Sequence, residues 1–147
     1  MPARSILVAT DFSAPSRRAL EWARLLHARL NAAVMVVHVD TDPFVHTTLR
    51  DDAAKWETES ERGRRLDWLK SELRTQIDDV FGPDAQAVRT LVVRGETVEQ
   101  LTDLALERDA DLLVVGASGK NAVDRLLLGS TTQELVQRSP IPVLTVH

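Results

Sequence analysis

Five short runs of apolar residues, separated by longer segments with helical periodicity, limit most strongly what this chain can fold into. The runs cover residues 6–10, 33–39, 88–93, 111–116 and 142–146. Their apolarity is continuous rather than alternating, although Arg89 and Thr90 weaken the third run. Continuous apolarity over so few residues is typical of parallel strands, because helices cover both faces of a parallel sheet. We therefore predict five buried strands.

The segments between these runs predict helices. Ser13 is expected to cap the first helix, Pro15 lies in its first turn, and Asn31 can end it. The second helix is expected to close at Gly82 and Pro83. The apolar stripe of the first helix consists of Leu20, Ala23, Leu26 or His27, and Leu30, and that of the second consists of Leu66, Leu69, Leu73, Ile77 and Val80.

The rest of the chain predicts two further helices and one long connection. Residues 41–56 mix proline, threonine and charges without a clear period, so we expect a connection there. The residues from Thr97 to Gln100 fit a capping box at the start of the third helix. Ser130–Arg138 is expected to form the fourth helix. The stripe of the third helix consists of Val98, Leu101, Leu104 and Ala105.

This alternation of strands and helices predicts an α/β fold, because right-handed crossovers place helices on both faces of a parallel sheet. We expect residues 1–147 to form a single doubly wound domain with a five-stranded parallel sheet of order 3-2-1-4-5. Ligands of such sheets bind beyond the carboxyl ends of the strands, where the winding direction reverses. Thr10 and Asp11 follow the first strand, and Gly116 ends the fourth. We expect these two strand ends to line one crevice.

The composition excludes several classes of protein. The chain contains no cysteine, which excludes disulfides, cysteine-ligated zinc and thiol catalysis. The net charge of −4 argues against a surface that binds nucleic acid or an anionic membrane. The longest uncharged apolar stretch, residues 30–39, is too short to span a bilayer. We therefore expect a cytoplasmic protein that neither binds nucleic acid nor inserts into membranes.

A glycine-rich segment follows the fourth predicted strand. Two residues separate Gly116 from Gly119, and nine more lead to Gly129, which Ser130 and Thr131 follow at a helix start. Glycines let backbone N–H groups approach an anion, and a helix N-terminus adds unsatisfied donors with positive partial charge. The segment therefore fits a phosphate site. Taken separately, the same residues also fit a turn, a loop and a helix cap.

The spacing of these glycines resembles the nucleotide-binding signature of the universal stress protein family. Residues 6–13 are similar to that family's opening strand and turn, and residues 36–39 to its second strand. Residues 94–97 resemble the turn after its third strand, and residues 139–144 its closing segment. The resemblance covers nearly the whole chain and leaves residues 41–86 unconstrained. It implies a protein that binds ATP or ADP together with Mg²⁺.

The resemblance also implies roles for individual residues. Asp11 is similar to the aspartate that contacts the ribose, and Ala9 and Thr10 stand beside the adenine. Val39 resembles the position whose backbone contacts the adenine. The implied phosphate site consists of Gly116, Gly119, Gly129 and Ser130, and we expect Ser118 and Thr131 to belong to the binding residues as well.

Two departures from the family pattern affect this site. The family often has a proline where this chain has Ala9, which implies looser packing of the adenine. Between the first two glycines, Ala117 and Ser118 supply less charge than the family's common residues do. For Asp11 a second interpretation stays open, because an aspartate just past a strand is often only a turn or cap residue.

The resemblance implies a nucleotide-dependent stress-response or regulatory module. No pattern in the sequence supplies a convincing general base for phosphoryl transfer. The alternatives are slow ATP hydrolysis and a dimeric interaction protein that does not use nucleotide. Asp40 could bind a ribose in a dinucleotide site, but residues 10–14 contain no glycine to admit a pyrophosphate. The four histidines form no metal motif, so the metal ligands stay unknown.

We also expect a homodimer through the closing strand, Val143–Val146. In the predicted order this strand lies at the edge of the sheet, where unpaired backbone groups invite pairing with a second copy. The resemblance has the same implication, since family members commonly dimerise through their last strand. A downstream protein partner is not predictable. Trp22, Trp56 and Trp68 are expected to serve packing, with a ligand cover as the alternative for Trp56, and His38 is expected to be a half-buried strand residue.

Overall fold

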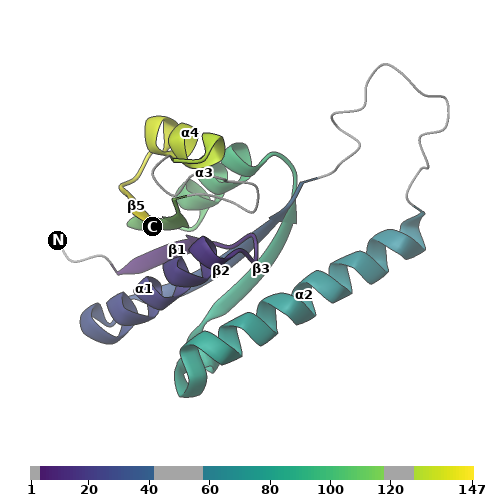
Figure 1. Cartoon of the computed structure of the whole chain (residues 1–147), viewed down its shortest axis with the longest axis horizontal. Helices are drawn as coiled ribbons and strands as arrows, with labels where there is room; N and C mark the ends of the chain where they lie inside the picture. Colours follow the sequence, from purple (N-terminus) through teal and green to yellow (C-terminus); the bar gives the residue numbers. More distant parts are fainter. Residues whose placement is uncertain (1–3, 42–57, 118–127) are drawn as a thin grey trace.

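The computed structural model describes residues 4–41, 58–117 and 128–147, and its elements follow the predicted alternation (Figure 1). The strands are β1 (Ser5–Ala9), β2 (Ala33–Asp40), β3 (Arg89–Arg94), β4 (Leu112–Gly116) and β5 (Val143–Val146). The helices are α1 (Ala14–Leu30), α2 (Glu59–Phe81), α3 (Thr97–Glu107) and α4 (Ser130–Arg138), with a short 3-10 helix at Gly82–Ala87 after α2. The predicted connection at 41–56 lies, apart from Thr41, outside the described residues.

The sheet confirms the predicted topology. Its strand order is β3-β2-β1-β4-β5, and all four pairings are parallel. The register places Val8 of β1 between Val36 of β2 and Val114 of β4. The winding direction of the sheet reverses between β1 and β4, so a ligand crevice is expected at the carboxyl ends of these two strands.

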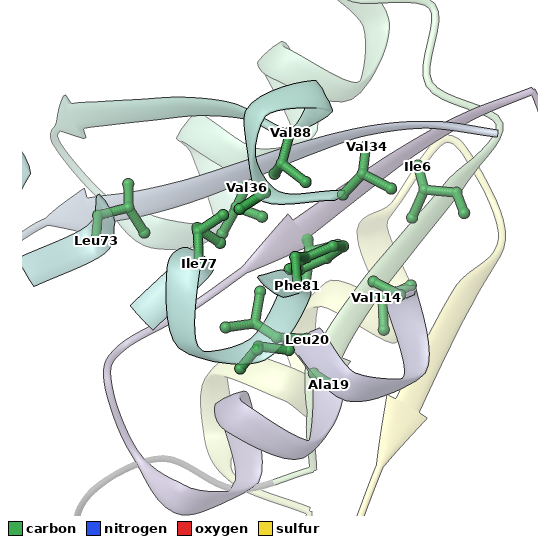
Figure 2. Packing of buried hydrophobic residues seen from close by; sticks show 14 of the residues in the cluster. Ile6, Ala19, Leu20, Val34, Val36, Leu73, Ile77, Phe81, Val88 and Val114 are labelled. Atoms are coloured by element: carbon green, nitrogen blue, oxygen red, sulfur yellow. The ribbon is translucent and has the colours of Figure 1, made fainter. Parts of the chain in front are cut away.

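Two hydrophobic clusters, one on each face of the sheet, explain why the strand sequences are continuously apolar. Ile6 and Val8 belong to the cluster under α1 and α2, whereas Leu7 belongs to the cluster under α3 and α4. Figure 1 shows the two helix pairs on opposite sides of the sheet. In Figure 2 the fully buried Phe81 lies amid side chains from the sheet, α1 and α2. Burying such a side chain stabilises the fold by about 1.5–3 kcal/mol.

The caps of α1 confirm the sequence prediction, whereas the cap of α3 does not. The Ser13 side chain accepts a hydrogen bond from the N–H of Ser16, and Asn31 ends the helix in the left-handed conformation, with φ 53°. The predicted capping box from Thr97 to Gln100 is wrong. Glu96 occupies the cap position instead, and its carboxylate accepts bonds from the backbone of the first turn. A carboxylate there also complements the helix dipole.

Asp111 attaches the beginning of β1 to the beginning of β4. Its Oδ2 accepts hydrogen bonds from the backbone N–H groups of Arg4, at 2.7 Å, and Ser5, at 2.9 Å. These bonds, the one from Arg4 first, lower the pKa of the Asp111 carboxyl below its ordinary value. A lowered native-state pKa means that ionised Asp111 stabilises the fold above the unfolded-state pKa of about 3.9. This contribution is lost as the pH falls through the native pKa.

We therefore expect Asp111→Asn to lower the free energy of unfolding at pH 6, and the difference from wild type to shrink as the pH falls below about 4. Urea unfolding at several pH values measures this difference. Asp103→Asn, at an exposed acid on α3, is the matched control. A difference between wild type and Asp111→Asn that stays constant over this pH range would contradict the assignment.

No helix among the described residues is both long enough and apolar enough to cross a membrane.

Candidate functional site

A cleft of about 680 Å³ opens at the carboxyl ends of the strands, with lining residues from both helix layers. This volume lies within the range of pockets that hold small-molecule ligands. All eight predicted binding residues that the structure describes line the cleft: Ala9, Thr10, Asp11, Val39, Gly116, Gly129, Ser130 and Thr131. The other two, Ser118 and Gly119, lie outside the described residues.

The turn after β1 carries Asp11 at the edge of the cleft. Its Oδ1 accepts a hydrogen bond from the N–H of Ser13 at 3.0 Å, which is the turn role left open by the sequence. Phe12 has a positive φ of 64°, an uncommon conformation for a residue other than glycine. Its ring lies 4.6 Å from the ring of His38. Asp11 Oδ1 therefore holds the turn. Oδ2 has no hydrogen-bond partner among the described residues, so it is available to a ligand.

Thr10 holds the turn after β1 in place through several hydrogen bonds. Its buried hydroxyl donates to Oε1 of Gln76 at 2.8 Å, accepts from the N–H of Phe12 at 3.1 Å, and lies 3.1 Å from the hydroxyl of Ser16. Its backbone N–H donates to the carbonyl of Val37, and its carbonyl accepts from Nδ1 of His38. Because protein partners engage the hydroxyl and the backbone alike, Thr10 fixes the position of the turn.

Gly116, the last residue of β4, has a packing role as well as a place in the cleft. A Cβ built on Gly116 would lie 2.8 Å from the carbonyl carbon of Pro15 and 2.9 Å from the backbone nitrogen of Ser16. Its carbonyl accepts a hydrogen bond from the hydroxyl of Thr132 in α4. The start of α1 therefore packs directly against this glycine, and the first turn of α4 is attached to it.

The N-terminus of α4 faces the cleft with open hydrogen-bond donors. Its cap residue, Gly129, offers no side chain, whereas Ser13, Thr58 and Glu96 cap the other three helices of the described chain with theirs. The N–H of Gly129 donates to the carbonyl of Ala117 at 2.8 Å, which orients the entry to the helix. Uncapped N–H groups with the positive end of the helix dipole form a favourable position for an anion.

Asp40 and Arg65 form an ion pair at the opposite side of the cleft. The Asp40 carboxylate accepts three hydrogen bonds from the guanidinium of Arg65, two of them at 3.0 and 3.1 Å. The Asp40 side chain is 10% exposed, and Nε of Arg94 lies 3.9 Å from its Oδ2. This engagement disfavours the dinucleotide interpretation further, because the carboxylate that would hold a ribose is already bound.

The two described tryptophans do not serve packing as the sequence analysis expected. Trp22 of α1 is 47% exposed and Trp68 of α2 is 60% exposed, so this expectation is wrong for both, while Trp56 lies outside the described residues. Trp68 lines the cleft beside the buried Leu69. The half-buried strand position expected for His38 is confirmed.

Several lining residues were missed by sequence reasoning. They include Phe12, Ser16, His38, Arg65, Trp68 and Leu69. The helical pattern of residues 66–80 predicted that Leu69 lies on a buried stripe. Nothing in the sequence indicated that α2 reaches the ends of β1 and β2. Within the described ranges, no group of three or more His, Asp or Glu side chains is arranged to hold a metal ion.

Comparison with known proteins identifies a family. The model of the universal stress protein family matches residues 2–147. A universal stress protein of Thermus aquaticus is 29% identical over 146 residues, which cover 98% of each chain. The structure of a universal stress protein from Lactobacillus plantarum superposes with a TM-score of 0.80 at 24% identity, covering 97% of each chain.

A further solved structure is similar to this chain and contains a ligand. It is the crystal structure of a universal stress protein in complex with cAMP, with a TM-score of 0.69 at 27% identity, covering 100% of this chain and 98% of that one. The family model spans nearly the whole chain, and the relatives match it in both sequence and fold. The chain belongs to the universal stress protein family.

Proposed function

We propose that this protein binds an adenine nucleotide, ATP or ADP together with Mg²⁺, in the cleft at the carboxyl ends of β1 and β4. The observation that carries the proposal is the convergence of residues from four separate parts of the chain. The turn after β1, the end of β2, the end of β4 and the start of α4 all line one cleft. The relative with bound cAMP supports an adenine nucleotide as the ligand class.

In this proposal the nucleotide lies across the strand ends. The adenine lies beside Ala9 and the backbone of Val39, and the ribose contacts Asp11. The phosphates lie toward β4, where the first turn of α4 supplies N–H donors and Gly129 offers no side chain to block them. Mg²⁺ often binds through phosphate oxygens with one or two carboxylates, so an absence of a ligand cluster in the described residues is compatible with it.

We infer that the protein acts by binding, as a nucleotide-dependent regulatory or stress-response module. Phosphoryl transfer needs a positioned base for the attacking water. The two acids that line the cleft, Asp11 and Asp40, hold a turn and an ion pair respectively. The residues that line the cleft therefore fit nucleotide binding better than activation of water.

Isothermal titration of the full chain with ATP, ADP and cAMP, each with and without Mg²⁺, tests the proposal. Saturable binding of ATP or ADP with a stoichiometry of one per chain is the expected result. Binding that strengthens with Mg²⁺ would support the metal–nucleotide complex as the ligand. Absence of binding by any adenine nucleotide at millimolar concentration would contradict the proposed function and favour a module that does not use nucleotide.

A homodimer through β5 is the proposed assembly. In the strand order β5 lies at the edge, and Val143 and Leu144 are partly exposed. We expect the wild type to sediment at about twice 16.3 kDa and Leu144→Lys to shift it toward monomer, because a charge opposes strand pairing at the edge. Val136→Lys, at a residue of α4 that is 49% exposed, is the matched control. A wild type that sediments as a monomer at micromolar concentration would exclude this dimer.

A further inference from the structure

Trp68 is a large aromatic side chain at an unusual position. It is 60% exposed, although tryptophan is on average a highly buried residue, and it lines the cleft that the nucleotide is proposed to occupy. We propose that Trp68 covers the base of the bound nucleotide and so contributes to affinity and to recognition of the base. This inference rests on the proposed function and assigns a binding residue on α2.

The position of Trp68 at the cleft wall is held from two sides. Arg65 precedes it by three residues, so the two side chains share one face of α2, and the bonds from Arg65 to Asp40 fasten that face to the end of β2. Leu69, directly after Trp68, is 4% exposed and anchors the helix to the core. An exposed indole on a fixed helix loses little conformational freedom when it stacks on a ligand.

The strand order decides which part of a nucleotide meets Trp68. The open donors of α4 lie on the β4 side of β1, whereas α2 and its partner Asp40 lie on the β2 side. A nucleotide with phosphates at α4 therefore extends its base over β1 toward β2 and Trp68. Val39, the proposed contact of the adenine, directly precedes Asp40 and lines the same end of the cleft.

The cation at this end of the cleft does not make it a second phosphate site. Three hydrogen bonds engage the guanidinium of Arg65 with the Asp40 carboxylate, so this guanidinium is already held within the protein. An aromatic surface beside an ion pair whose groups are already engaged suits a flat, uncharged ring. Stacking of a nucleic-acid base on an aromatic side chain is lost on alanine substitution at a cost corresponding to about a 5- to 150-fold change in affinity.

Titration of Trp68→Ala with ATP tests the assignment, and we expect affinity to fall by about 5- to 150-fold. Trp68→Phe should recover most of the loss, since phenylalanine keeps an aromatic face. Trp22→Ala is the matched control, because Trp22 is similarly exposed but belongs to α1 and is not among the described lining residues. If Trp68→Ala binds ATP within about twofold of wild type, the assignment is overturned while the proposed function stands. If the wild type binds no adenine nucleotide, both fail.

Fluorescence provides a second measurement that does not depend on the alanine variant. In Trp22→Phe/Trp56→Phe, Trp68 is the sole tryptophan, and ATP should change its emission whereas inorganic tripolyphosphate should not. In Trp56→Phe/Trp68→Phe, with Trp22 as the sole tryptophan, emission should not respond to ATP. An equal response of Trp68 to tripolyphosphate, or no response to saturating ATP, would show that the indole does not cover the base.

Discussion

Replacing Gly129 with valine is expected to weaken ATP binding by at least about 100-fold and to leave the fold intact. Hydrogen bonds to a charged group contribute about 1.5–3 kcal/mol each, so losing two at the phosphates accounts for this loss. Gly129 lines the cleft at the cap position of α4, where the lack of a side chain lets an anion approach the N–H groups. Its φ of −61° and ψ of 153° are accessible to valine without backbone strain.

Calorimetric titration and urea unfolding, performed on the same Gly129→Val protein, separate binding from stability. Gly63→Val is a suitable control for the added side chain, because nothing lies within 4 Å of the position that its Cβ would occupy in α2. Ser130→Ala should have a smaller effect on affinity, since it removes one hydroxyl and keeps the backbone donors. ATP affinity equal to that of the wild type in Gly129→Val would show that the phosphates bind elsewhere.

The fold could be predicted because its signals are local or periodic. Continuous apolarity in residues 6–10 reports burial on both faces, and in the structure Leu7 and Val8 indeed belong to different clusters. The caps of α1 at Ser13 and Asn31 depend only on neighbouring residues, so their sequence signatures were sufficient. The right-handedness of the crossovers then required helices on both faces of the sheet.

The α2 wall of the cleft could not be predicted, because it depends on contacts between distant parts of the chain. The ion pair between Asp40 and Arg65 joins residues 25 positions apart, and the bond between Thr10 and Gln76 joins residues 66 apart. No periodicity reports such contacts. The prediction for the cap of α3 failed for a different reason: threonine is a preferred cap residue and glutamate is not, so the sequence pointed to Thr97 rather than to Glu96.

The role that the sequence motif indicates for Gly116 differs from the role that the structure gives it. The glycine pattern assigned it to the phosphates, whereas the structure places the backbone of Pro15 and Ser16 where its Cβ would be. Gly116→Val is therefore expected to lower the free energy of unfolding by more than about 3 kcal/mol, since two rigid backbone segments would have to separate. Gly116→Ala, which adds the Cβ alone, should cost about 1–3 kcal/mol. Urea unfolding measures both.

The same substitution should thus affect ATP binding at one glycine of the motif and stability at the other. Valine at Gly129 is expected to remove ATP binding from a stable protein, whereas valine at Gly116 is expected to destabilise the protein whether or not nucleotide is present. Saturating ATP would raise the stability of Gly116→Ala by mass action if its site survives. A fully stable Gly116→Val that merely binds ATP weakly would instead place Gly116 in the phosphate site alone, and would show that the start of α1 can move away from β4.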